Sequence, residues 1–150
     1  MHAVINNLKR NKMEKHFCNY NQSLALKELG FNEPCFAYYQ KSAVIGNDTI
    51  LPIQIMDKSS NFNDVDYSKI GVPFWSAPLK SQVFEWARKE HKIHCSYGTT
   101  SDSREEVNGY CISNFIDGNR NYLHIDWEVG TYDEAESACI DKLIEIIKKK

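Results

Sequence analysis

Apolar residues recur at helical spacing in the middle of the chain, within residues 73–94. The stripe consists of Leu79, Val83, Trp86 and Ala87. Ser76 can act as an N-cap, because its hydroxyl can accept a hydrogen bond from a free backbone N–H, and Pro78 suits a first turn because it has no N–H to lose. We therefore predict a helix that begins directly after Ser76. Because large side chains bury much area, Trp75 and Trp86 make this segment the expected centre of the core.

Two further helices are predicted, one near each end of the chain. Asn19 and Gln22 have the spacing of a capping box, and Gly30 can end the short helix that follows. Thr131 and Glu134 repeat the capping pattern before the last helix. The wide apolar arc of that helix favours packing flat on a sheet. The arc consists of Ala135, Cys139, Ile140, Leu143, Ile144, Ile146 and Ile147.

Between the first two helices the pattern changes to that of strands. Residues 35–39 are dense in aromatic side chains and predict one strand, and residues 49–55 predict its partner after a turn at 46–48. Pro52 cannot donate a backbone hydrogen bond, so the second strand is expected at a sheet edge or to carry a bulge. Residues 57–70 are rich in Ser, Asn and Asp and are predicted to form a long loop, where function can reside.

The clearest hairpin lies in the second half of the chain, after a short predicted strand at 93–97. Residues 107–116 and 121–127 flank Asp117 and Gly118, a pair typical of a type I′ turn. Alternation predicts that one face of the hairpin carries Tyr110, Ile112, Leu123, Ile125 and Trp127. The other face is predicted to carry Cys111, Ser113, Phe115, Tyr122, His124 and Asp126.

The predicted order of elements is α-β-β-α-β-β-β-α. Because hairpins dominate this order, we expect an α+β fold, with helices packed on one face of an antiparallel sheet. Residues 17–150 are expected to form a single domain, and the polar residues 1–16 a flexible arm. Met13 offers an alternative translation start, which leaves open whether residues 1–12 belong to the native product.

Composition narrows the class of protein. The chain has 150 residues, of which 42% are hydrophobic, and it contains no apolar run near the ~20 residues of a membrane span. The net charge is −2, and basic residues gather at both ends. The acidic body between them argues against a nucleic-acid groove. The five cysteines form no Cys-x-x-Cys motif and follow no signal peptide, so we expect reduced thiols in a cytoplasmic protein.

Residues after the central helix have the chemistry of a metal or ligand site. His91, His94 and Cys95 could ligate a metal, but no second cluster supplies a fourth ligand, so no metal or other cofactor is expected. An anionic ligand such as a nucleotide needs arginine forks and aromatic rings. The candidates for such a site are Arg88, His91, His94, Tyr97 and Arg104. No glycine-rich phosphate-binding motif accompanies them.

The predicted hairpin face offers a second candidate site. A thiol beside a histidine and an aspartate can form a nucleophile with its base, which makes Cys111, His124 and Asp126 catalytic candidates. No motif fixes their order, and nothing marks an oxyanion hole. A sheet face that is solvated or covered by a helix is the simpler interpretation of these residues.

Three stretches together, residues 23–39, 76–86 and 132–144, resemble a group of small uncharacterised proteins carried by phages and mobile elements of Bacteroides and its relatives. The resemblance covers most of residues 17–147. It implies an intracellular bacterial setting and an accessory role, and it transfers no catalytic motif and no site residue.

These observations favour a non-enzymatic protein that binds a host or phage protein and that forms a homodimer. An exposed apolar patch near the 57–70 loop or on an edge strand would support this function. The first alternative is a binding protein for an anionic nucleotide signal, a counter-defence sponge. The second is a small hydrolase that uses the face of the 107–127 hairpin.

Overall fold

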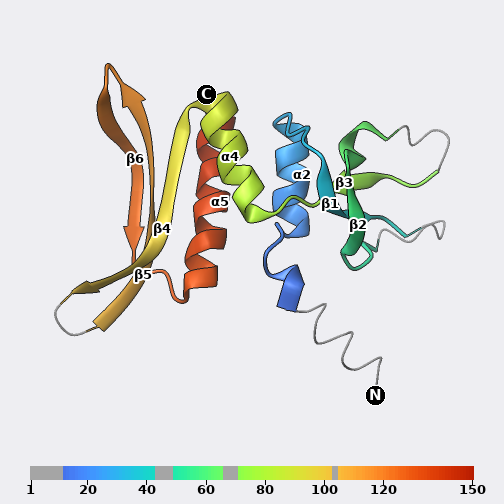
Figure 1. Cartoon of the computed structure of the whole chain (residues 1–150), viewed down its shortest axis with the longest axis horizontal. Coiled ribbons are helices and arrows are strands. Elements are labelled where there is room, and N and C mark those ends of the chain that lie inside the picture. Colours follow the sequence, from blue (N-terminus) through green and yellow to red (C-terminus); the bar gives the residue numbers. More distant parts are fainter. Residues whose placement is uncertain (1–11, 43–48, 66–70, 103–104) are drawn as a thin grey trace. The chain divides into compact units, whose positions relative to one another are not determined.

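The computed structural model describes residues 12–42, 49–65, 71–102 and 105–150, which divide into two compact units (Figure 1). Unit 1 ends at Leu79, and unit 2 runs from Lys80 to Lys150. Each unit has its own antiparallel sheet of three strands in the described residues, which confirms the α+β class and divides the strands between two sheets. In the described residues, no helix combines the length and hydropathy needed to cross a membrane.

Unit 1 packs one helix on a short sheet. In chain order its elements are α2 (Tyr20–Glu28), β1 (Cys35–Gln40), β2 (Gln54–Ser60), the 3₁₀ helix η1 (Phe62–Asp64) and β3 (Phe74–Ser76). The strand order is β2-β1-β3. Tyr20 of α2 packs edge-on against Tyr39 and Trp75, at centroid distances of 5.8 and 5.5 Å. The capping box of Asn19 and Gln22 is confirmed at the start of α2.

The second strand of unit 1 lies later in the sequence than predicted. The predicted partner at 49–55 is wrong for most of its length, since β2 begins at Gln54 and takes up the first residues of the predicted loop. Pro52 lies just before β2, and among the described residues β2 is an edge of its sheet. Residues 66–70 of that loop, the predicted turn at 46–48, and residues 1–11 of the predicted arm lie outside the described residues.

The central helix begins three residues later than predicted. Ser76 belongs to β3, where its hydroxyl accepts a hydrogen bond from the Phe62 N–H at 3.1 Å and its own N–H donates to Asn63 at 3.0 Å. Because that hydroxyl holds η1 against β3, it does not cap a helix. The helix α4 starts at Lys80. Sequence reasoning missed β3 because the strand is only three residues long.

Unit 2 packs two helices with a second sheet. Its elements are α4 (Lys80–His91), β4 (Ile93–Asp102), β5 (Glu105–Ile116), β6 (Asn119–Trp127) and α5 (Tyr132–Lys148). The strand order is β4-β5-β6, and α5 packs on β4 and β5 (Figure 1). The predicted turn is confirmed, because Asp117 and Gly118 both have positive φ, 51° and 80°. The capping box of Thr131 and Glu134 is also confirmed.

A bulge reverses the predicted faces of the hairpin. Ile112 pairs with His124, but the next residue, Ser113, pairs with Tyr122, so Leu123 has no partner on β5. Directly paired residues of antiparallel strands point to the same face. We name the face of Tyr110, Ile112, His124 and Asp126 the helix side, and the face of Cys111, Phe115, Tyr122, Ile125 and Trp127 the open side. The prediction that His124 and Asp126 share a face with Cys111 is therefore wrong.

Candidate interaction site

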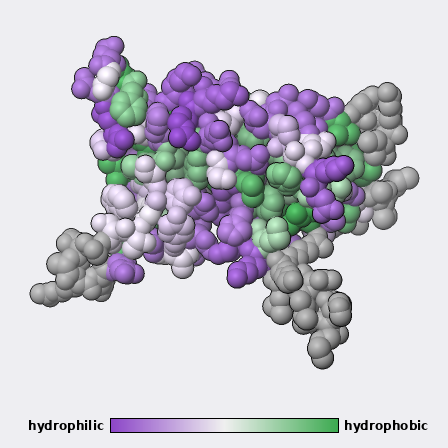
Figure 2. Space-filling model, in the orientation of Figure 1, coloured by the Kyte–Doolittle hydropathy of each residue, from purple (hydrophilic) through white to green (hydrophobic). Residues whose placement is uncertain are grey.

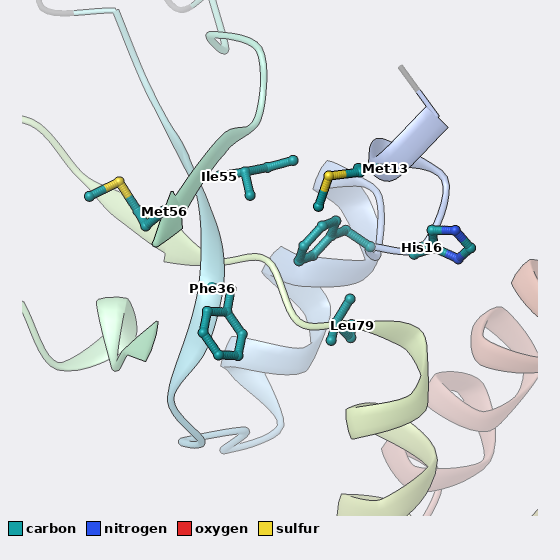
Figure 3. A pocket seen from close by; sticks show the side chains of 7 residues that line it. Met13, His16, Phe36, Ile55, Met56 and Leu79 are labelled. Carbon is teal, nitrogen blue, oxygen red and sulfur yellow. The ribbon is translucent and has the colours of Figure 1, made fainter. Parts of the chain in front are cut away.

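An apolar groove lies on unit 1, between its first described residues and the strands β1 and β2 (Figure 3). Its volume is about 280 Å³. The lining residues are Met13, His16, Phe17, Phe36, Ile55, Met56 and Leu79. Six of these seven side chains are apolar, so the groove is suited to bind apolar groups.

The wall of the groove that faces β1 and β2 is formed by residues near the start of the described chain, and hydrogen bonds and packing hold it in place. Residues 12–14 form a helical turn, which His16 closes by donating its N–H to the Met13 carbonyl at 3.1 Å. Phe17 then pairs with Leu79 in an isolated antiparallel bridge. Phe17 is buried among the core residues that also include Ala37 and Ile53. The wall is therefore anchored to the core of unit 1.

The strand wall is formed by residues that point to opposite faces of the sheet. Ile55 pairs with Ala37 and packs against the core, whereas Phe36 and Met56, one position away, are turned outward. Phe36 is 41% exposed and Met56 is 47% exposed, and Met13 across the groove is 51% exposed. The groove thus has a buried floor and three exposed apolar side chains at its rim.

A second apolar hollow, of about 230 Å³, shares Met56 with the groove. Its other lining residues are Tyr38, Phe62, Val65 and Phe74. Tyr38 packs against two of the other lining residues, because its ring centroid lies 4.7 Å from that of Phe62 and 5.3 Å from that of Phe74. We call the groove and the hollow together the Met56 surface. In the space-filling view, hydrophobic side chains gather over unit 1 (Figure 2).

The candidate catalytic residues of the hairpin do not meet. His124 and Asp126 lie on the helix side of the sheet, where Asp126 pairs with Tyr110 and the ring centroids of His124 and Tyr110 lie 5.6 Å apart. Burial, followed by the nearby carboxylate of Asp126, raises the pKa of Tyr110. Cys111 pairs with Ile125 on the open side. The thiol is therefore separated from the histidine and the aspartate by the sheet itself.

The candidate ligand-binding residues are dispersed over unit 2. Arg88 is exposed on α4, and His94 lies on the open side of the sheet, where its ring contacts Phe115 at 5.1 Å. Tyr97, an odd number of residues further along β4, points to the helix side and contacts Tyr132 at 5.4 Å. Burial and a hydrogen bond to Glu136 raise the pKa of Tyr97. Arg104 lies outside the described residues.

His91 is engaged at the end of α4. Its ring contacts Trp86 at a centroid distance of 4.6 Å, and its carbonyl accepts a hydrogen bond from Lys150 at 3.2 Å. Burial and the charge of Lys150 lower its pKa. Among the described residues, no group of three His, Cys, Asp or Glu side chains is arranged to hold a metal ion.

The buried thiols are poor nucleophiles. Burial raises the pKa of the Cys35 thiol to about 12. A hydrogen bond with Cys95 and burial raise the pKa of Cys139. Because the thiolate is the reactive form, both residues stay protonated near neutral pH. All five cysteines are free thiols, and Cys18, Cys35 and Cys139 are buried.

Sequence reasoning missed the residues of the Met56 surface. Met13 was considered only as a translation start, and Met56 lies in the last residues before the predicted loop. The sequence analysis did expect an exposed apolar patch near the 57–70 loop or on an edge strand. Met56 lies on β2, an edge strand in the described residues, next to that loop. Met13 stands alone in a polar stretch, and Met56 follows the last residue of the predicted strand, so the pattern gave no basis for predicting the exposure of either side chain.

Comparisons with protein-family models, with curated proteins and with solved structures found no match to this chain. The geometry and chemistry of the Met56 surface are therefore the basis on which a function is proposed.

Proposed function

We propose that the protein is a non-enzymatic interaction module that binds an extended segment of a partner protein on the Met56 surface. The observation that carries this proposal is the pair of apolar hollows on either side of one exposed methionine. Patches of this kind on a protein surface mark interaction sites. Methionine is suited to such a site because its flexible, polarisable side chain adapts to different partners.

The chemistry of the surface favours apolar side chains over an anionic nucleotide. An anion needs arginine or lysine donors, whereas neither hollow is lined by an arginine or a lysine. Each hollow is smaller than the ~300–1,000 Å³ typical of small-molecule sites. We therefore expect a partner segment that places one large apolar side chain in each hollow.

The location of the Met56 surface also predicts the backbone conformation and the charge of the bound partner segment. Met56 belongs to β2, which is a sheet edge in the described residues, so an extended segment can add main-chain hydrogen bonds beside it. Lys12 is exposed next to Met13. An acidic residue beside the apolar anchor would complement this lysine.

We propose the cytoplasm as the setting, with a host or phage protein as the partner. The five free thiols support a reducing compartment. An accessory role of a phage or mobile-element protein fits a module whose described site binds and does not catalyse. The nucleotide sponge and the hydrolase have less support, because their candidate residues are dispersed over unit 2 or separated by its sheet.

The experiment selects peptides from a random phage-displayed library on the immobilised full chain. The best binder is synthesised and titrated into protein with ¹³C-labelled methionine methyl groups. The chain has three methionines, and two of them line the Met56 surface, so Met13→Leu and Met56→Leu variants assign the spectrum. We expect selected peptides to carry two large apolar residues with an acidic neighbour, and to shift the signals of Met13 and Met56.

The matched variants are Met56→Asp and Ile116→Asp. Both replace an exposed apolar side chain by the same carboxylate, at 47% and 53% exposure, but Ile116 lies on β5 in unit 2. We expect Met56→Asp to weaken peptide binding by about tenfold or more, the loss typical of an interface anchor, and Ile116→Asp to bind as the wild type does. Equal binding by Met56→Asp, or binders without apolar residues, would refute the proposed function.

A further inference from the structure

Two cysteine side chains of unit 2 face each other between its sheet and its last helix. Cys95 of β4 pairs with Ile112, which places it on the helix side of the sheet. Cys139 of α5 is completely buried in the region where this helix packs on β4 and β5. A hydrogen bond joins the two thiols. Both cysteines are free thiols, so they are able to form a bond with each other.

The contact follows from the way in which β4 and α5 run beside each other. The ring centroid of Tyr97 lies 5.4 Å from that of Tyr132, and its hydroxyl is hydrogen-bonded to Glu136. Cys95 lies two residues before Tyr97, on the same side of the strand, and Cys139 lies three residues after Glu136, on the same face of the helix. One step along each element therefore brings the two cysteines together. A disulfide needs side chains that point at each other from neighbouring backbones, and this packing supplies them.

The two thiols differ in their access to solvent. Cys95 is partly buried, whereas Cys139 is 0% exposed. The hydrogen bond with Cys95 and burial both raise the pKa of Cys139, so Cys139 keeps its proton. Because the thiolate is the form that attacks an oxidant, Cys95 is the thiol that reacts first, and Cys139 lies beside it as the second thiol. An accessible thiol next to a second one is typical of a redox-sensitive pair.

We propose that Cys95 and Cys139 form a reversible disulfide when the protein reacts with a peroxide. The Cys95 thiolate attacks one peroxide oxygen, so an S–O bond forms, the O–O bond breaks, and the leaving hydroxide takes up the proton that Cys95 released and becomes water. The Cys139 sulfur then attacks the Cys95 sulfur, so the S–S bond forms, the S–O bond breaks, and the hydroxyl group leaves as a second water with the proton of Cys139. The two thiols lose two electrons, which reduce one peroxide. A dithiol reverses the reaction by thiol–disulfide exchange.

The disulfide would join β4 covalently to α5. Because α5 already packs on β4, the bond would form within the folded unit and would keep its architecture. It would close a loop that contains β5 and β6, and this constraint on the unfolded chain would stabilise unit 2. The modification site lies in unit 2, and it does not depend on partner binding on the Met56 surface of unit 1.

The first test treats the folded full chain with hydrogen peroxide, blocks the remaining thiols with iodoacetamide and digests the protein with trypsin without reduction. Trypsin separates Cys95, Cys111 and Cys139 into peptides 93–104, 105–120 and 121–142. We expect mass spectrometry to find peptide 93–104 linked to peptide 121–142 as the main disulfide, and to lose this link after dithiothreitol. Absence of the link, a main link to peptide 105–120, or a link that forms only in urea would each overturn the proposal.

The second test compares Cys95→Ser with Cys111→Ser, which removes a partly buried thiol from the open side of the same sheet. The urea midpoint of each peroxide-treated protein is measured before and after dithiothreitol, which reduces a disulfide but not methionine sulfoxide. We expect dithiothreitol to lower the midpoint of the wild type and of Cys111→Ser, and to leave that of Cys95→Ser unchanged. A lowered midpoint for Cys95→Ser, or an unchanged one for Cys111→Ser, would overturn the proposal.

A third variant tests the order of the two steps. Cys139→Ala removes the second thiol, so the oxidised Cys95 has no sulfur beside it with which to form the disulfide. We expect peroxide to leave Cys95 of this variant as a sulfenic acid, which dimedone labels on peptide 93–104. The wild type, whose Cys139 converts the sulfenic acid to the disulfide, is expected to take up less dimedone at Cys95. Equal labelling of Cys95 in the two proteins would refute the role of Cys139.

Discussion

Gly109 on β5 leaves the space that Trp127 of β6 fills. A Cβ atom at this position would lie 2.5 Å from Trp127 Cε3 and 2.7 Å from Trp127 Cα, and it would also clash with the carbonyl oxygen of Asp126. These distances are too short for any side chain, and two of the three atoms belong to the backbone. Glycine is therefore required at this close approach of the two strands.

We predict that Gly109→Ala destabilises the protein by about 1–3 kcal/mol, because β6 must move away from β5 to admit the methyl group. The midpoint of urea denaturation, followed by circular dichroism, measures the effect. Gly98→Ala is the control: Gly98 pairs with Gly109 on the neighbouring strand, and a Cβ there meets nothing within 4 Å. Equal midpoints for the two variants would contradict the close packing of Trp127 on Gly109.

At the scale of elements, an ion pair joins the two helices of unit 2. Lys80 Nζ at the start of α4 lies 3.2 Å from Glu136 Oε2 on α5, and the two side chains are only 8% and 14% exposed. Glu136 also accepts a hydrogen bond from Tyr97 of β4. One carboxylate thus connects α5 with both α4 and the sheet. Removing the lysine would leave that carboxylate largely buried without its charged partner.

We predict that Lys80→Met lowers the free energy of unfolding by on the order of 2 kcal/mol. The cost stays below the ~3–5 kcal/mol of a broken, fully buried pair because Glu136 retains some exposure. The double variant Lys80→Met/Glu136→Gln removes both charges and keeps a polar side chain for Tyr97, so it should recover most of the loss. A double-mutant cycle measures this coupling: urea denaturation gives the free energy of unfolding of the wild type, Lys80→Met, Glu136→Gln and the double variant. Additive losses would show that the two charges are not coupled.

Most helices and strands of this fold could be predicted from the local sequence pattern. The predictions were wrong where contacts between distant residues determine the structure. The capping boxes and the Asp117-Gly118 turn were predicted because their chemistry is complete within a few residues. Ser76 satisfies the same local rule for an N-cap, but η1, some dozen residues earlier in the chain, takes its hydroxyl. The bulge at Leu123 has no signal in alternation, and it reversed the side on which every later residue of β6 lies.

At the scale of the whole molecule, each of the two units contains a buried core of its own. The core of unit 1 gathers around Phe17, Ala37, Ile53 and Ala77. In unit 2, α5 buries Cys139, Ile140 and Leu143 in the region where it packs on β4 and β5. A core within each unit is the condition for independent folding. The sequence alone predicted a single domain for residues 17–150, because a chain of 150 residues is of ordinary length for one domain.

We predict that residues 1–79 and 80–150, expressed separately, each fold. The measurement is the amide spectrum of each fragment by two-dimensional NMR, compared with that of the full chain. Dispersed signals that overlay on those of the full chain are expected for both fragments. Collapsed spectra for both fragments, with a single unfolding transition of the full chain, would instead support the single domain.

The exposed thioethers of Met13 and Met56 make the Met56 surface sensitive to oxidants. Oxidation to the sulfoxide converts a flexible apolar side chain into a polar one. With 51% and 47% exposure, both sulfur-bearing side chains can be reached by peroxide without unfolding of unit 1. A sulfoxide at Met56 would place a strong dipole between the two apolar hollows. Oxidising conditions are thus expected to disable the proposed partner binding and to leave the fold intact, and reductases of methionine sulfoxide would restore the surface.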